Sequence, residues 1–183
     1  MDDAAIGLVE FNSIAMGVLS LDAMMKRAAV KLIDAFPVCP GKFIILVCGE
    51  VGAVRDSVKA GCATGKEQVI GDIVIPQVHP DVITAIGGTT PVDGLEAVNV
   101  FETFSIAACV LAADAAVKAA AVRLIEVRLA KGLGGKSFFS MTGSLSDIRS
   151  AEKAAREQIT DDGMLFASII IPAPHADVAR ALL

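Results

Sequence analysis

The sequence contains no tryptophan and no tyrosine, and its eight phenylalanines bring the aromatic content to only 4%. It also lacks any run of lysine or arginine, and its formal net charge is -5. Nucleic-acid-binding proteins combine clustered positive charge with aromatic side chains that stack on bases. The composition therefore argues against a nucleic-acid partner.

Long uncharged segments are missing as well, although 54% of the residues are hydrophobic. The longest stretch without Asp, Glu, Lys or Arg lies between Asp162 and Asp177 and contains two prolines, so no segment is expected to span a bilayer. The acidic start at residues 1–3 does not resemble a secretory signal. The four cysteines include no C-x-x-C pair. These features favour a cytoplasmic protein that does not use a disulfide framework.

The chain is a tandem repeat. When residues 5–34 are aligned with residues 97–126, half of the thirty positions are identical. The offset of 92 residues then rises to 94 at Gly41-Lys42, and to 96 at Ile75-Pro76. The second copy therefore carries two insertions relative to the first.

A Gly/Thr/Pro stretch at residues 86–96 joins the two copies. We expect a first domain at residues 1–92 and a second at residues 93–183. Because alanine and valine supply most of the apolar content and suit large subunit interfaces, the composition also favours an obligate oligomer.

Hydrophobic periodicity predicts the secondary structure of each copy. Apolar runs in the first copy predict strands at residues 5–10, 30–36, 43–48 and 69–75. A first helix is expected after a Ser13 N-cap, a second between the middle strands and the last one, and a short third at residues 80–86. The first helix is indicated by apolar residues at helical spacing: Ile14, Val18, Leu21, Met25 and Ala28.

The two middle strands are expected to form a hairpin, broken by Pro37, Pro40 and Gly41. The order β-α-β-β-α-β is typical of the ferredoxin-like α/β sandwiches. The predicted fold class is therefore α/β (α+β), with a tandem duplication of such a unit. A unit of this kind leaves one sheet face or edge in need of cover, which again favours assembly.

The segment from Ala130 to Ser137, A-K-G-L-G-G-K-S, nearly matches a phosphate-binding loop. Such a loop must lie between a strand and a helix N-terminus, whereas the repeat places this segment between two strands. A glycine-rich hairpin or a pore rim is the better interpretation. No triad, H-E-x-x-H motif or carboxylate pair points to an enzyme, and no catalytic residue is expected.

His79 and His175 are repeat-equivalent, and each follows a strand and a proline, where it is expected to cap the next segment. Glu10 and Glu102 end equivalent strands and are interpreted as structural. Cys48, Cys62 and Cys109 fall at apolar positions and are interpreted as core residues.

Cys39 differs from the other cysteines because it lies in a loop between prolines and occurs once per chain. Its counterpart at an offset of 92 is Lys131. From the residues alone, two interpretations remain open: an incidental loop thiol, or a ligand that becomes useful only where a threefold axis brings three copies together.

Several motifs together resemble one family, the bacterial microcompartment shell proteins in their tandem-domain form. They are A-I-G-L-V-E at residues 5–10, D-A-M-M-K-R-A-A-V at 22–30, C-P-G-K-F at 39–43, and the I-P-x-x-H ending of both copies. Within the family, the C-P-G-K-F loop and the tandem order are most similar to the T-type subunits of propanediol-utilisation shells.

This resemblance implies a microcompartment shell domain in each copy and a homotrimer that forms a pseudohexagonal tile. Tiles would pack edge to edge with other shell proteins around encapsulated enzymes. The family's edge lysine corresponds to Lys26 and Lys118. Many shell domains also carry an arginine in I-P-R-P-H, whereas this chain has Gln77 and Ala173, which puts that edge contact in doubt.

The resemblance also implies that the hairpin loops line a central pore. The residues expected there are Val38, Pro40, Gly41, Lys131, Gly132, Leu133 and Gly134. By the same resemblance, Cys39 from each of three chains would ligate one [4Fe-4S] cluster per trimer. Such a cluster would pass electrons across the shell, with an encapsulated redox enzyme as a partner.

Two alternatives compete with this hypothesis. The first is a cluster-free trimer whose central pore conducts small metabolites. The second is a trimeric ligand-binding or catalytic protein that uses clefts between subunits, although no convergent acid–base set in the sequence supports it.

Overall fold

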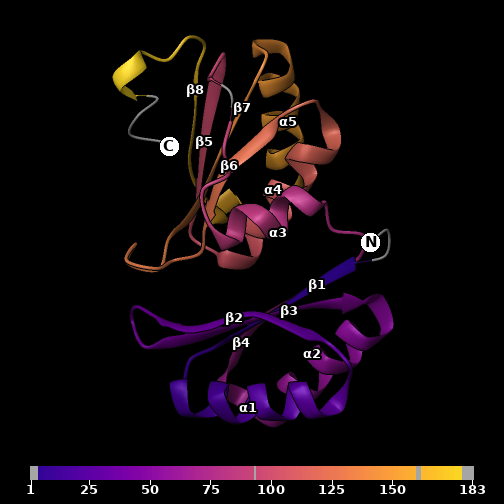
Figure 1. Ribbon diagram of the computed structural model, residues 1–183. Helices are drawn as coiled ribbons and strands as arrows, with labels where there is room; N and C mark the ends of the chain where they lie inside the picture. The colour runs from indigo at the N-terminus through magenta and orange to yellow at the C-terminus, as the bar shows by residue number, and fades with distance from the viewer. Residues whose placement is uncertain (1–3, 93, 160–161, 179–183) are drawn as a thin grey trace. The chain divides into compact units, whose positions relative to one another are not determined.

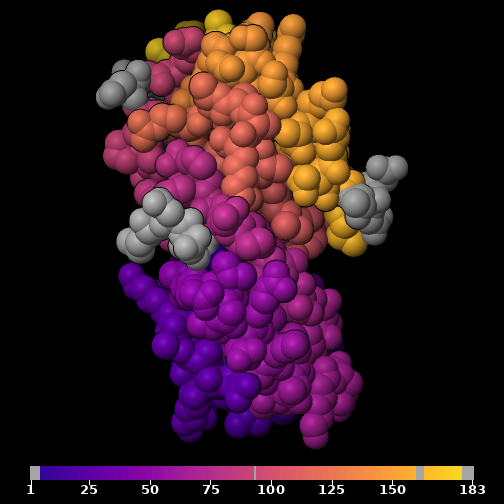
Figure 2. Space-filling model, turned by 90° about the vertical axis from the view of Figure 1, so that its right-hand side faces the viewer, coloured from indigo at the N-terminus to yellow at the C-terminus, as the bar shows by residue number. Residues whose placement is uncertain are grey.

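The computed structural model describes residues 4–92, 94–159 and 162–178. The chain divides into two units, Met1–Val78 and His79–Leu183. The first unit is one continuous stretch of chain, and its described residues run from indigo to magenta in the space-filling view (Figure 2). No helix in the described part of the chain is long and apolar enough to cross a membrane.

The first unit contains a four-stranded antiparallel sheet in the order β2-β3-β1-β4, with α1 and α2 on one of its faces (Figure 1). Its elements are β1 (Ala4–Phe11), α1 (Ile14–Arg27), β2 (Lys31–Val38), β3 (Lys42–Glu50), α2 (Val51–Gly65), η1 (Lys66–Gln68) and β4 (Val69–Ile75). This is the sheet order of a ferredoxin-like unit, so the predicted β-α-β-β-α-β arrangement is confirmed.

The second unit repeats the arrangement, with a sheet in the order β6-β7-β5-β8. Its elements are α3 (Pro80–Gly87), β5 (Ala97–Thr103), α4 (Ile106–Ala119), β6 (Arg123–Arg128), β7 (Ser137–Gly143), α5 (Leu145–Gln158), η2 (Asp162–Met164) and β8 (Leu165–Ile171). Even the breaks in strand pairing recur: the register shifts after Glu10 and again after Glu102. The duplication is therefore structural as well as sequential.

Both insertions fall outside the main elements. The first insertion lies in the connection from β6 to β7, residues 129–136. The equivalent connection in the first copy, from β2 to β3, spans only residues 39–41. The second lies between α5 and η2 and includes residues 160–161, outside the described part of the chain. The order of helices and strands is kept because insertions are tolerated in connections and not in packed elements. The lengths of α1 and α4 are equal, whereas β6 and β7 are each two residues shorter than β2 and β3.

The start of each first helix follows from its sequence. Ser13 and Ser105 lie at the N-caps of α1 and α4, and each hydroxyl accepts a hydrogen bond from a backbone N–H of the first turn. The Ser13 cap was predicted, and its repeat in the second unit explains why both helices begin at equivalent positions.

Three sequence interpretations need correction. Pro37 lies within β2 and not in the hairpin turn, which is confined to residues 39–41. Proline is tolerated there because β2 is an edge strand, so one side of its backbone needs no partner in the sheet. Cys48 and Cys62 are only half-buried, whereas Cys109 is fully buried as expected.

The apolar stripe that predicted α1 does not coincide with the face of α1 that packs against its own unit. Its buried residues are Gly17, Ser20 and Met24, whereas Ile14 and Val18 of the stripe are exposed. The helix has a glycine at position 17 because Phe43 of β3 fills the space beneath it.

The boundary predicted at residues 92 and 93 stays a prediction, and residue 93 lies outside the described part. Helix α3 belongs by sequence to the first copy, yet it packs on β6 and α4 of the second unit (Figure 1). The backbone N–H of His79, just before α3, donates to Oδ1 of Asp114 on α4 at 2.8 Å.

We predict that Gly17→Ala destabilises the first unit by about 1–3 kcal/mol, because a Cβ there would lie 2.5 Å from Cδ1 of Phe43. The second unit has Cys109 and Ser137 at the equivalent positions, a larger helix residue and a smaller strand residue. Thermal or urea unfolding measures the change. Gly71→Ala is the control because nothing lies within 4 Å of its Cβ, and an equal loss in both variants would contradict the packing argument.

Candidate functional site

Cys39 lies at the tip of the β2–β3 hairpin. Residues 39–41 form the turn, in which the backbone N–H of Gly41 donates to the Val38 carbonyl at 2.9 Å. Gly41 has a φ of 90°, a conformation that favours glycine. The Cys39 thiol is free and exposed, so the turn presents it to solvent.

An ion pair between buried or half-buried side chains supports the base of each hairpin. Nζ of Lys42 lies 2.8 Å from Oε1 of Glu10, and Nζ of Lys136 lies 2.9 Å from Oε2 of Glu102. The structural interpretation of both glutamates is consistent with these pairs. The lysine partners were not predicted, although their signal is in the repeat, where both members of the pair recur together.

The longer hairpin of the second unit contains the phosphate-loop-like segment. It joins β6 to β7 and no helix follows it, which supports the hairpin interpretation over nucleotide binding. Positive φ angles occur at Gly132, Gly134 and Gly135, so the glycines allow the loop to turn repeatedly. Lys131, Gly132 and Gly134 are exposed.

The other predicted pore residues differ in exposure. Pro40 and Gly41 are exposed, Leu133 is half-buried, and Val38 is buried at the end of β2. Val38 therefore anchors the hairpin within its own unit. Whether the loops line a pore depends on contacts between chains, so the pore stays a prediction.

The two predicted edge lysines occupy equivalent places on α1 and α4. Lys26 pairs with Asp22 at 2.7 Å, and Lys118 pairs with Asp114 at 2.5 Å, both one helical turn apart. The Lys26 side chain is 75% exposed. Exposed pairs of this kind contribute little to stability, which leaves Lys26 available for contacts with another molecule.

Both histidines cap the segments that follow them, as predicted. Nδ1 of His79 accepts from the N–H of Asp81 at 3.3 Å, and Nδ1 of His175 accepts from the N–H of Asp177 at 3.2 Å. This use of Nδ1 supports a structural role for the histidines.

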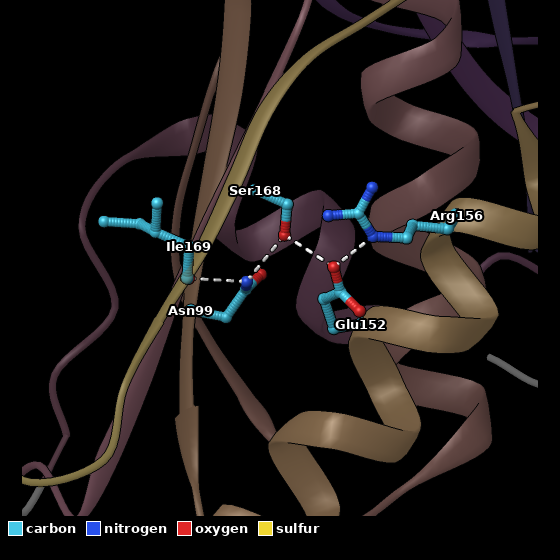
Figure 3. A network of polar contacts seen from close by, with 5 residues as sticks. All are labelled: Asn99, Glu152, Arg156, Ser168 and Ile169. Carbon is cyan, nitrogen blue, oxygen red and sulfur yellow. Dashed lines mark hydrogen bonds and ion pairs between the residues drawn. The ribbon is translucent and has the colours of Figure 1, made fainter. Parts of the chain in front are cut away.

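A polar network crosses the second unit between β5, β8 and α5 (Figure 3). Nδ2 of the buried Asn99 donates to Oγ of Ser168 at 3.0 Å and to the Ile169 carbonyl at 2.8 Å. The Ser168 hydroxyl donates to Oε1 of Glu152, which also binds Arg156. The network ties the edge strand β8 to the sheet and to α5, so we interpret it as structural.

The equivalent place in the first unit has different chemistry. Val58 and Cys62 of α2 replace Glu152 and Arg156, and Asp72 of β4 replaces Ser168. Burial, together with a smaller contribution from the negative charge of Asp72, raises the pKa of the Cys62 thiol to about 11. Cys62 is therefore protonated and unreactive near neutral pH.

No group of three or more His, Cys, Asp or Glu side chains that could hold a metal occurs among the residues the structure describes. Cys39 contributes one thiol, and the structure brings no second ligand to it within these residues. A thiolate is the ligand that iron–sulfur clusters use. The chemistry and exposure of Cys39 thus fit a cluster only where several chains each contribute one thiolate.

Comparison with known proteins defines the class. The BMC domain matches residues 5–78 and again residues 97–174. The chain therefore belongs to the bacterial microcompartment shell proteins, in tandem-domain form.

Comparison with individual shell proteins shows which of them this chain is similar to along its whole length. The bacterial microcompartment shell protein PduT of Citrobacter freundii is 40% identical over 178 residues, covering 97% of both chains. PduA of the same organism is 34% identical over 86 residues, which cover 45% of this chain and 90% of PduA. A microcompartment protein from Desulfitobacterium hafniense, known from its crystal structure, superposes with a TM-score of 0.92 at 46% identity, covering 97% of this chain and 98% of its own. The two-copy organisation is thus shared along the whole chain.

Thiol alkylation should distinguish the cysteines. At pH 8, in the presence of a metal chelator, we expect iodoacetamide to modify Cys39 well before Cys62 and Cys109. Burial raises the pKa of Cys109 to about 12, and a rise from 9.0 to about 11 leaves Cys62 with about a hundredfold less reactive thiolate. Peptide mass spectrometry reports the order, and Cys39→Ser is the control. Equal rates at Cys39 and Cys109 would contradict the burial of Cys109.

Proposed function

We propose that this protein is a structural shell subunit, and not an enzyme, that assembles as a homotrimer in the shell of a bacterial microcompartment. Two units of the same topology in one chain supply six pseudo-equivalent units to a ring of three chains. The whole-length similarity to a shell protein and the two BMC domains support this proposal. Such tiles would pack edge to edge with other shell proteins.

The trimer would hold one [4Fe-4S] cluster on its threefold axis, with Cys39 of each chain as a ligand. The observation that carries this proposal is the exposure of a single thiol at the tip of a three-residue hairpin, once per chain. Three thiolates satisfy three irons, which leaves the fourth iron to a ligand other than cysteine. The second unit, whose loop carries lysine and glycine instead, supplies no competing thiol.

A cluster at this place would lie in the wall between the cytoplasm and the microcompartment interior. One electron would enter from a redox protein on one side and leave to an encapsulated redox enzyme on the other. The role of the chain is then to hold the cluster in the tile, where the cluster would block the central pore.

The experiment combines mass and metal content. Protein purified or reconstituted without oxygen should be a trimer by light scattering, with about four iron and four acid-labile sulfide per trimer and an EPR signal after reduction. A monomer by light scattering would contradict the proposed trimeric tile. A trimer without iron after reconstitution would favour the alternative, a cluster-free tile whose pore conducts small metabolites past the exposed glycine-rich loop of the second unit.

Lys26→Ala should impair the formation of extended sheets and leave the trimer intact. Lys26 is 75% exposed and loses only a surface pair with Asp22, worth about 0–1 kcal/mol. Electron microscopy of assemblies and light scattering of the dissolved protein measure the two effects. Lys59→Ala, on α2, is a control for charge. Dissociation of the Lys26→Ala trimer would place Lys26 inside the trimer and not at its edge.

A further inference from the structure

The two units bury the same residues to very different extents. Val18 of α1 is 53% exposed, whereas its repeat-equivalent, Val110 of α4, is fully buried. The contrast extends to a set of apolar side chains on α1 and β2, here called the α1/β2 face: Ile14, Val18, Met25 and Leu32. All of their equivalents are buried in the second unit: Ile106, Val110, Val117 and Leu124. Because the sequences are so alike, the difference arises from what covers them.

In the second unit, α3 and the residues beside it provide the cover. Helix α3 packs on β6 and α4 and buries Val82 completely (Figure 1). The His79 N–H donates to Oδ1 of Asp114, and the Thr90 N–H donates to the Ile125 carbonyl at 2.7 Å. Segment 79–90, which follows the last strand of the first copy in the sequence, thus covers the apolar face of the second unit.

In the first unit, Asp22 corresponds to Asp114, but no segment equivalent to α3 covers it within the described residues. The Asp22 side chain is 58% exposed, compared with 9% for Asp114, although each binds the lysine one turn later through Oδ2. No hydrogen bond to Oδ1 of Asp22 occurs among residues 4–92, 94–159 and 162–178. The α1/β2 face therefore presents both the apolar surface and the carboxylate oxygen that α3 and His79 contact in the second unit.

The segment that follows β8, residues 172–178, is the repeat-equivalent of the segment that leads into α3, but it is largely exposed in the single chain. His175 caps it through Nδ1, and the Val178 N–H donates to the His175 carbonyl at 2.9 Å, as Val82 does to His79 at 3.0 Å. Val178 is 39% exposed, whereas Val82 is fully buried. Each chain thus carries two apolar faces and two covering segments, of which one pair is joined within the chain.

We propose that residues 172–178 of one chain dock on the α1/β2 face of a second copy, with the His175 N–H donating to Oδ1 of Asp22. The inference rests on the proposed trimer, in which each of three exposed α1/β2 faces meets one largely exposed segment at residues 172–178. It adds a contact between chains that repeats, on α1 and β2, the packing of α3 on α4 and β6 within the second unit. The occupant is a second copy of this chain because its C-terminal segment repeats the residues that cover the same face in the second unit.

Cross-linking of a paired cysteine variant tests the proposal. In a Cys39→Ser background, Asp22→Cys is combined with His175→Cys, and the protein is treated with a short bismaleimide. We expect covalent dimers and trimers on a denaturing gel. The matched control combines His79→Cys with Asp114→Cys, the same pair within the second unit, and should give a cross-link inside a single chain, seen by peptide mass spectrometry.

Each other outcome has a definite meaning. A cross-link between positions 22 and 175 within one chain would overturn the inference in favour of closure on the same molecule. A trimer by light scattering that gives no 22–175 cross-link, while the control links, would overturn the contact and leave the proposed tile standing. A monomer by light scattering would overturn both. Val178→Asp changes a side chain that is exposed in the single chain and gives a second measurement. The dissociation constant of the trimer should rise at least about tenfold.

Discussion

Cys39→Ser is expected to remove essentially all iron and sulfide from the reconstituted trimer while leaving its mass unchanged. Cys39 is exposed in a hairpin turn, so the substitution removes no buried contact and should not unfold the chain. Serine oxygen is a harder and weaker ligand than thiolate for an iron–sulfur cluster. Iron and sulfide analysis, with absorbance and EPR spectra, measures the loss.

Cys48→Ser is the matched control for that experiment. Cys48 is half-buried in β3, at a distance along the strand from the hairpin tip, so its replacement should keep the iron content near that of the unchanged protein. Iron retained in Cys39→Ser would show that other residues hold it. Iron lost equally in both variants would point to a folding defect and not to a ligand.

Val18→Asp should convert the trimer into monomers at micromolar concentration. In the single chain Val18 is 53% exposed, so the new charge costs the isolated unit little, as the position already faces water. In the assembly the same position would be as buried as Val110, and an unpaired carboxylate there would cost several kcal/mol. Light scattering or sedimentation gives the mass.

Val18→Ile is the control because it keeps the side chain apolar at the same place. Circular dichroism of both variants should match the unchanged protein, which separates dissociation from unfolding. A trimer that tolerates Val18→Asp would show that the α1/β2 face stays open to solvent in the assembly.

The elements of each unit could be predicted because their signals are local. The Ser13 cap predicted the start of α1, and the apolar run at residues 69–75 predicted the strand that the structure assigns as β4. The repeat then carried these elements to the second copy without further evidence. Most of the fold was therefore available from periodicity, caps and internal similarity.

The largest error concerns an apolar surface that is exposed in the single chain. The stripe of Ile14 and Val18 has the period of a core-facing helix, but Gly17, Ser20 and Met24 are the buried residues and the two stripe residues are exposed in the single chain. Periodicity reports that a face is apolar and does not report whether its partner belongs to the same chain. For the same reason, the ligand role of Cys39 stays a prediction, since the remaining ligands would come from other chains.

In the proposed trimer, the unequal hairpins would determine how many donor atoms converge on the threefold axis. A ring of six identical units would bring six thiols together, more than the four irons of a single cubane can use. In this chain one hairpin ends in Cys39 after a three-residue turn, and the other is a longer loop with lysine and glycine. In the proposed ring, duplication followed by divergence would lower the local symmetry from sixfold to threefold. The number of thiolates at the centre would then be set by the divergence of one loop, which has Lys131 where the other has Cys39.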